Sequence, residues 1–232
     1  MSSPIIDDVE DGKVEVIGIG APPGTGKSAF GKLVADGIAR RTGKPTLFID
    51  NEWGFTREMR VECSLQSGLQ LDTPEFARAF NRLGQIGYQA MIQNIAAQGV
   101  NVVFVGPFED LTAKIGEKTV LEVLQAQFAE FKFKFHYVLM CPDEARLEEL
   151  SDDDIMAPVE AEIRDRLLAR SEGNPVQARL DEPKLRDPNY YRKRAVKVVH
   201  SAKTLNIGIT RHSIGELPES VAAAVCEALY GD

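Results

Sequence analysis

The chain has 232 residues, of which 44% are apolar, and it carries a formal net charge of -8. This length and apolar share are enough for one α/β core with an insertion over it. The negative charge argues against a protein that coats nucleic acid, because such binding needs clustered basic residues. The three cysteines are well separated and form no C-x-x-C pair, so neither a disulfide framework nor a zinc site is indicated.

Short β-branched runs alternate with amphipathic helical stretches, the order typical of parallel strands joined by crossover helices. The expected strands cover residues 14–19, 46–49, 100–105, 137–140 and 204–209. One helix is expected after the first strand, and others over about residues 74–98, 117–131 and 217–229. The pattern predicts a three-layer, doubly wound, mostly parallel five-stranded sheet of the P-loop NTPase type, in a single domain over residues 1–232.

Residues 151–194 have a different composition from the rest of the chain. Acidic residues open the segment, which then becomes rich in arginine, proline and glycine and poor in core-forming residues. We expect this segment to be a helical lid inserted after the fourth strand.

The acidic N-terminus has no basic start or apolar run, and no segment reaches the ~18 consecutive apolar residues of a membrane span. We therefore expect a cytoplasmic protein. We expect it to be a monomer or a homodimer.

The strongest motif is the turn Ala21-Pro-Pro-Gly-Thr-Gly-Lys-Ser28, which matches G-x-x-x-x-G-K-[ST] except at its first position. It lies between an apolar strand and an amphipathic helix, where consecutive backbone N–H groups can curl around a phosphate. Lys27 would reach the β- and γ-phosphates of ATP, and Ser28 would ligate Mg²⁺. The residues expected to bind the nucleotide are Pro23, Gly24, Thr25, Gly26, Lys27, Ser28 and Ala29.

A second group of polar residues begins where the second strand ends, with Asp50, and continues with Glu52, Arg57 and Arg60. The carboxyl edge of a doubly wound sheet is where ligands bind. Asp50 could accept the proton of an acceptor hydroxyl or organise the Mg²⁺ shell, and Glu52 could share or replace that role. The two arginines could bind an anionic acceptor through their guanidinium groups. The alternative for Asp50 is an ordinary strand-end cap, and the alternative for the two arginines is solvated surface charge.

The sequence favours a kinase over other P-loop proteins. Remodelling ATPases need an acidic pair at the end of a later apolar strand, whereas Val102-Val-Phe-Val105 runs into Gly106-Pro107. GTPases are expected to carry an N-K-x-D guanine motif, and none is present. An ATPase or ATP-dependent switch without an acceptor is the alternative, followed by a regulatory nucleotide-binding module without catalysis.

These motifs resemble those of the small P-loop kinases and phosphotransferases, a family that includes zeta-toxin-like and chloramphenicol-phosphotransferase-like enzymes. The resemblance rests on the phosphate-binding turn, on Phe48-Ile-Asp50 with Arg57, and on the looser segments 99–107, 138–144 and 164–170. It implies transfer of the γ-phosphoryl group of Mg-ATP to a hydroxyl or phosphate acceptor, with Asp50 acting as base.

The resemblance also implies that lid arginines neutralise the transferring phosphoryl group. Arg166 and Arg170 match this position best, and their i, i+4 spacing sets them on one helix face. A solvated helix is the alternative, and Arg164, Arg179 and Arg186 are reserve candidates. The aromatic and basic run Asn189–Arg194 leaves a nucleic-acid-borne acceptor open beside small molecules and nucleotides.

Overall fold

The computed structural model describes residues 13–50, 55–71, 73–76, 79–80, 82–106, 108–142, 149–150 and 152–231, with the backbone alone for 55–59, 74 and 82–85. Five parallel strands form its main sheet, in the order β2-β3-β1-β6-β7. This arrangement confirms the predicted α/β class. The strands are β1 (Glu15–Gly20), β2 (Thr46–Asp50), β3 (Asn101–Gly106), β6 (Lys132–Met140) and β7 (Ile209–His212).

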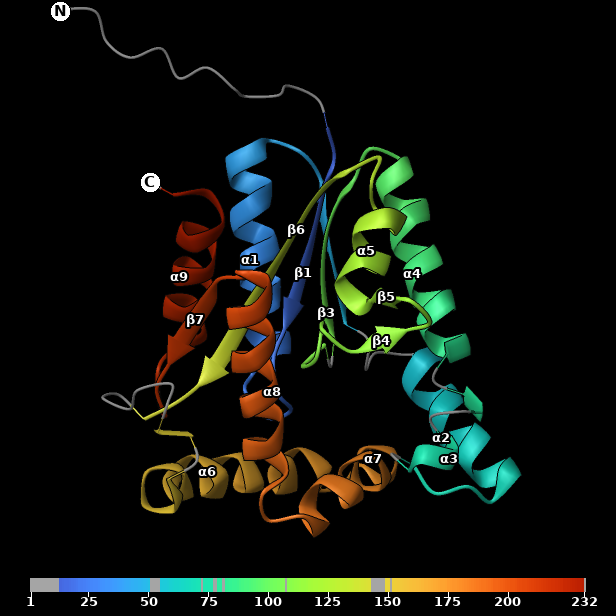
Figure 1. Ribbon diagram of the computed structural model, residues 1–232, viewed down its shortest axis with the longest axis vertical. Coiled ribbons are helices and arrows are strands. Elements are labelled where there is room, and N and C mark those ends of the chain that lie inside the picture. The colour runs from blue at the N-terminus through green and yellow to red at the C-terminus, as the bar shows by residue number, and fades with distance from the viewer. Residues whose placement is uncertain are drawn as a thin grey trace, which may run out of the picture.

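Helices occupy most of the remaining described chain, together with a small antiparallel hairpin, β4 (Lys114–Ile115) and β5 (Lys118–Thr119) (Figure 1). No helix in the described ranges is both long enough and apolar enough to cross a membrane. The helices are α1 (Lys27–Thr42), α2 (Phe55–Ser67), α3 (Pro74–Phe76), α4 (Arg82–Ala97), α5 (Val120–Gln127), α6 (Asp153–Ser171), α7 (Pro175–Arg186), α8 (Tyr190–Leu205) and α9 (Pro218–Tyr230).

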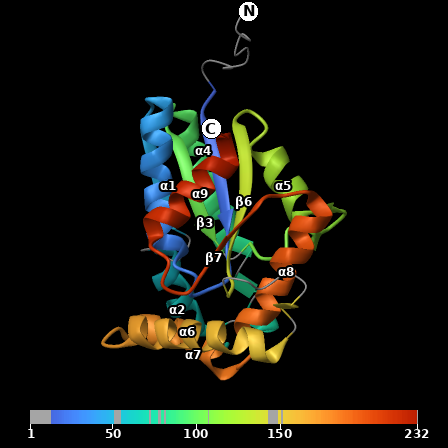
Figure 2. The same ribbon diagram turned by 90° about the vertical axis from the view of Figure 1, so that its left-hand side faces the viewer.

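Two helical layers cover the sheet because its central strands are apolar on both faces (Figure 2). Successive side chains of a strand point to opposite faces. Val102 of β3 therefore packs in the core beneath α4, α5 and α8, and its neighbour Val103 packs in the core beneath α1 and α9. This layering fixes α1 on one face of the sheet and brings its first residues to the carboxyl end of β1.

The predicted strand over residues 204–209 is wrong. Val198, Val199 and Ala202 are buried at helical spacing, so α8 continues to Leu205. Asn206 then adopts the left-handed conformation, with φ 51°, and ends the helix. The last strand therefore begins at Ile209 rather than ending there.

The predicted helix over residues 74–98 is divided into α3 and α4. Tyr88 of α4 packs in a core against the sheet, whereas Phe76 of α3 packs in a separate small core. This satellite core consists of Val61, Leu71, Phe76 and Leu180, from α2, the loop after it, α3 and α7. The two ends of the predicted helix therefore serve different cores.

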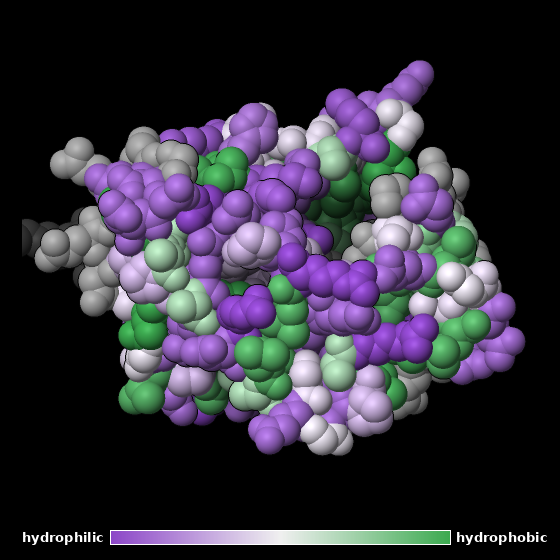
Figure 3. All heavy atoms as spheres, turned by 90° about the horizontal axis from the view of Figure 1, so that it is seen from below, coloured by the Kyte–Doolittle hydropathy of each residue, from purple (hydrophilic) through white to green (hydrophobic). Residues whose placement is uncertain are grey.

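The segment expected to be a lid contains α6, α7 and the start of α8. Helices α6 and α7, which we call the cover helices, cross below the carboxyl ends of the strands (Figure 1). Contrary to the low core content expected from composition, α6 buries Met156, Val159, Ile163 and Leu167 along one face. Seen from below, this side of the molecule has a hollow with an apolar floor and a polar rim (Figure 3).

Candidate active site

The phosphate-binding turn adopts backbone conformations that require glycine. Gly24 and Gly26 have φ values of 82° and 83°, in the left-handed region that L residues rarely adopt. A Cβ on Gly24 would also lie 2.8 Å from Cγ2 of Ile163 on α6. The turn is held from within by Thr25, whose buried hydroxyl donates to the carbonyl of Pro22 at 2.8 Å. These features fix the shape of the turn, residues 21–26, between β1 and α1.

The first turn of α1 presents the positive end of the helix to this loop. Gly26 is the N-cap and supplies no side-chain hydrogen bond, and the first turn contains no acidic residue. Lys27 is the first helical residue and is only 4% exposed. The amino end of a helix, its dipole and a buried lysine together suit an anion, and we call the turn and this helix end the cradle.

Asp50 meets this cradle from β2, two strands away from β1 in the sheet. In the sheet, Asp50 pairs in register with Val105 of β3, and Gly106, one residue further on, pairs with Gly20 of β1. The carboxylate therefore lies at the same edge as the cradle, where it is 4% exposed. The hydroxyl of Ser28 donates a hydrogen bond to its Oδ2. The predicted pair of Ser28 and Asp50 is thus brought into direct contact.

These two oxygen-bearing side chains fit a magnesium ion. Mg²⁺ prefers oxygen ligands and is usually held by one or two carboxylates together with substrate phosphates and water. The described residues contain no group of three or more His, Cys, Asp or Glu side chains that could hold a metal ion by themselves. A nucleotide's phosphates would have to complete the shell around Ser28 and Asp50.

Tyr88 was not singled out by the sequence, yet it lies beside Asp50. Its hydroxyl lies 2.9 Å from the carbonyl of Val105 and 3.1 Å from that of Ile49, at the ends of β3 and β2. Burial and, secondarily, the Asp50 charge raise the pKa of this phenol well above its usual value. Tyr88 therefore stays protonated and fixes the two strand ends. In the sequence it reads only as another apolar position of a helix.

Helix α6 lies directly against the cradle. Arg166 reaches the turn, with Nη1 3.4 Å from the carbonyl of Gly24, and its Nε donates to Glu162 at 2.7 Å. One third of the Arg166 side chain is exposed. A guanidinium thus stands beside the glycine turn, and its action on a transferred phosphoryl group stays a prediction.

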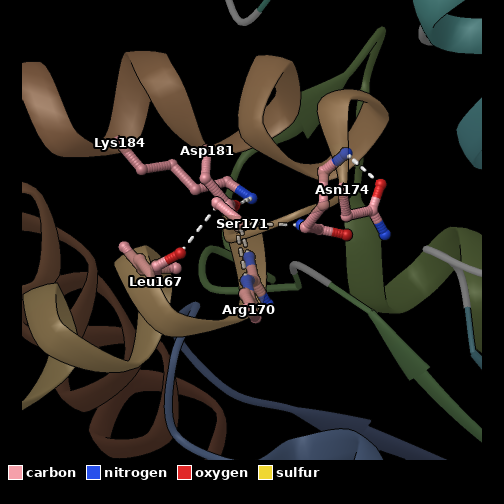
Figure 4. A network of polar contacts seen from close by, with 7 residues as sticks. Leu167, Arg170, Ser171, Asn174, Asp181 and Lys184 are labelled. Carbon is pink, nitrogen blue, oxygen red and sulfur yellow. Dashed lines mark hydrogen bonds and ion pairs between the residues drawn. The ribbon is translucent and has the colours of Figure 1, made fainter.

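Arg170, one helical turn further on, is anchored to α7 (Figure 4). Its Nε and Nη2 donate to the two carboxylate oxygens of Asp181 at 2.6 and 2.5 Å. Asp181 is completely buried and also accepts from Lys184, Gln177 and Ser171. Burial opposes ionisation, but the Arg170 hydrogen bonds and the Lys184 charge outweigh it and hold the Asp181 pKa below its usual value.

The structure describes the other predicted acceptor residues only in part. Glu52 lies outside the described residues, as does the side chain of Arg57. Arg60 of α2 has its guanidinium carbon 6.0 Å from the centre of the Phe76 ring, in the satellite core region. Their contact with an acceptor stays a prediction. Among the reserve arginines, Arg164 donates to Leu185, Arg186 pairs with Glu182, and Arg179 is exposed.

The basic and aromatic run Asn189–Arg194 is engaged within the fold. Tyr191 is buried and donates to the carbonyl of Met140 at 2.6 Å. Arg192 pairs with Asp153 and, at 2.8 Å, with Glu160 of α6. Arg194 pairs with Glu109 at 2.8 Å, with its guanidinium carbon 4.4 Å from the centre of the Tyr190 ring. Through these contacts, much of the run serves to attach the cover helices to the sheet.

No family model and no curated protein matches the chain. Among solved structures, it is similar to the APS kinase of Mycobacterium tuberculosis in complex with AMPPNP and APS. The two share 11% identity with a TM-score of 0.43, over 94% of this chain and 98% of the other. The sheet order and the glycine turn before α1 are what define a fold of the P-loop NTPase type.

Proposed function

We propose that this protein is a P-loop phosphotransferase that moves the γ-phosphoryl group of ATP to a hydroxyl or phosphate acceptor. One observation carries the proposal: Ser28 of the cradle is hydrogen-bonded to Asp50, a buried carboxylate at the end of β2, which β3 separates from β1 in the sheet. A base or metal-organising group is thereby held beside the phosphate-binding turn. Phosphoryl transfer depends on such positioning and charge more than on covalent chemistry.

Each residue of the site has a separate task in this proposal. The amides of the cradle and Lys27 hold the triphosphate, and Ser28 with Asp50 would hold Mg²⁺. Asp50 also orients the acceptor and takes its proton. Arg166 offsets the negative charge on the transferring group. Bound Mg-ATP supplies the activated phosphoryl group and the metal charge that screens it.

The ends of β2 and β3 favour a kinase over an ATPase without an acceptor. A remodelling ATPase would need carboxylates at the end of β3, where the described residues offer Gly106 and then, further on, Glu109 and Asp110. Glu109 is 5% exposed and paired with Arg194 of α8. The carboxylate that contacts the cradle instead follows β2, so an ATPase or switch is the second candidate.

The test combines nucleotide binding with an acceptor screen. Transfer from radiolabelled ATP is measured across sugars, nucleotides, antibiotics and DNA, and binding of the non-hydrolysable analogue AMPPNP is measured with Mg²⁺. Asp50→Asn should still bind AMPPNP and should lose about 100-fold or more in transfer rate, the usual contribution of a positioned acid or base. Asp36→Asn, an exposed change on α1, is the matched control and should transfer normally.

Two outcomes would contradict the proposal. Normal transfer by Asp50→Asn would remove Asp50 from the mechanism. A wild-type protein that binds neither AMPPNP nor ADP would remove the nucleotide chemistry altogether. Rapid hydrolysis of ATP that no acceptor on the panel changes would favour the ATPase.

A further inference from the structure

Helix α6 packs on the glycine turn of the cradle through one apolar side chain. Ile163 is 3% exposed, and its Cγ2 atom lies 2.8 Å from the position that a Cβ on Gly24 would take. Ile163 belongs to the buried face of α6, which packs in the same core as Tyr191 of α8 and Leu139 of β6. This packing holds α6 at a fixed place over the turn.

Arg166 reaches the same turn from one helical turn further along α6. Its Nη1 lies 3.4 Å from the carbonyl oxygen of Gly24 and 3.9 Å from the position that a Cβ on Gly26 would take. Gly26 is the N-cap of α1 and directly precedes the buried Lys27. The guanidinium group therefore lies beside the helix end that suits an anion.

Glu162 holds this guanidinium group at a different nitrogen. Its Oε1 accepts from Nε of Arg166 at 2.7 Å, and the acidic residue comes four positions earlier, the favourable order in a helix. A guanidinium has five N–H groups, and the contacts with Glu162 and Gly24 use one each. No further hydrogen-bond acceptor for Arg166 is found among the described residues. Because a third of the Arg166 side chain is exposed, a ligand can reach its other N–H groups.

A second pair with the same spacing lies on α7 and serves for comparison. Glu182 and Arg186 are also four residues apart, and both side chains are more than half exposed. Such surface pairs contribute little. The pair of Glu162 and Arg166 differs because its arginine also contacts Gly24, 142 residues away in the chain. Holding Nε therefore also sets where the far end of the guanidinium group meets the turn.

We propose that Glu162 is a positioning residue, which orients Arg166 so that its guanidinium group binds phosphate oxygens of a nucleotide in the cradle. This inference rests on the proposed function, because it requires a nucleotide there. A phosphate oxygen is a stronger acceptor than the carbonyl of Gly24 at 3.4 Å, so bound phosphate would take over that contact. An arginine that is already oriented loses less side-chain entropy on binding.

The sign of the effect on binding separates positioning from simple charge. The Glu162 carboxylate repels a triphosphate by its charge, so removing that charge alone should tighten binding. Glu162→Ala removes both the charge and the hydrogen-bond acceptor, whereas Glu162→Gln keeps an oxygen that can accept from Nε. Charge alone predicts tighter binding in both variants. Positioning predicts weaker binding in Glu162→Ala and a partial rescue in Glu162→Gln.

The experiment measures binding of AMPPNP and of inorganic tripolyphosphate, both with Mg²⁺, by isothermal titration. Glu162→Ala should weaken both ligands about two- to tenfold, the cost of ordering one long side chain. Both should weaken equally because Arg166 contacts the glycine turn. Glu162→Gln should bind both more tightly than Glu162→Ala. Glu182→Ala is the matched control and should bind both within about twofold of the wild type.

A double-mutant cycle tests whether Glu162 acts through the arginine. In the Arg166→Gln background, Glu162→Ala should weaken neither ligand further. Alanine is the best helix former and Glu162 is partly exposed, so these variants should fold, which circular dichroism and thermal unfolding verify.

Several results would overturn the inference. These are unchanged or tighter binding in Glu162→Ala, no rescue by Glu162→Gln, a loss for AMPPNP without one for tripolyphosphate, and an equal loss in the Arg166→Gln background or in Glu182→Ala. A wild-type protein that binds neither ligand would instead refute the proposed function.

Discussion

The cradle and the cover helices handle charge in opposite ways. The cradle combines the amino end of α1 with the buried Lys27 where an anion is expected, and Gly24 and Gly26 set its shape. The cover supplies its own anion, Asp181, which satisfies Arg170 and Lys184 within the protein. The positive groups of the first region are expected to meet a ligand, whereas those two side chains of the second region pair with a carboxylate of the protein. This contrast separates residues that would bind a ligand from residues that hold other side chains of the protein in place.

The largest effect expected on stability is in the cover. Asp181→Asn removes the charge shared by Arg170 and Lys184, and losing one partner of a buried ion pair costs about 3 kcal/mol or more. Denaturant unfolding at neutral pH measures this loss. Unfolding that matches the wild type would mean that the cover is not stabilised by its internal anion.

The same variant has a defined pH dependence. Arg170 and Lys184 outweigh the effect of burial, so the pKa of Asp181 is lower in the folded state than its ordinary value of about 3.9. The stabilisation is therefore fully present above that ordinary value and is lost as the pH falls through the folded pKa. The difference between wild type and Asp181→Asn should shrink below about pH 4. A difference that grows on acidification would contradict this assignment.

An intermediate loss of stability is expected for a change in the cradle. Gly24→Ala forces an L residue into the left-handed region, which costs about 1–2 kcal/mol, and its Cβ would press on Ile163 of α6. Thermal unfolding should show the loss, and AMPPNP binding should weaken with it.

Gly87→Ala is the matched control for that change. Gly87 lies in α4, is exposed, and would meet no atom within 4 Å. Alanine at such a helical site should stabilise the protein by about 0.4–1 kcal/mol. Equal destabilisation by both variants would mean that the conformation at Gly24 is not what the cradle requires.

The smallest effect is expected on the outer surface of the cover. The pair Glu182–Arg186 is more than half exposed, and such pairs contribute about 0–1 kcal/mol. Glu182→Gln should unfold within that margin of the wild type and should show little dependence on salt. A loss comparable with that of Asp181→Asn would remove the distinction between the buried anion and the surface charges of α7.

Local sequence patterns were sufficient to predict the glycine turn of the cradle and most strands of the sheet. The glycine spacing before Lys27 and the apolar runs of the central strands each depend on residues close together in sequence. The carboxyl edge also follows from the strand pattern, which is why Ser28 and Asp50 were both selected. The last strand was misplaced because Leu205 to Ile209 alternates like a strand, while burial of Val198 and Ala202 continues the helix.

The contacts of the cover could not be derived in this way. Arg166 and Arg170 are equivalent by their spacing, and both match the family's lid position. Asp181 lies 11 residues beyond Arg170 and has no motif around it. Tyr88 is likewise indistinguishable from an apolar helix residue until the ends of β2 and β3 are seen beside it.

The sequence by itself determined the α/β class and the glycine turn before α1, because glycine conformation and strand hydrophobicity are properties of short segments. Only the tertiary structure decided which arginine lies at the cradle and which is held by α7. The positions of the two arginines depend on where α6 and α7 cross the edge of the sheet. That crossing is set by contacts between residues far apart in the chain, such as Arg192 with Glu160 and Leu180 with Phe76.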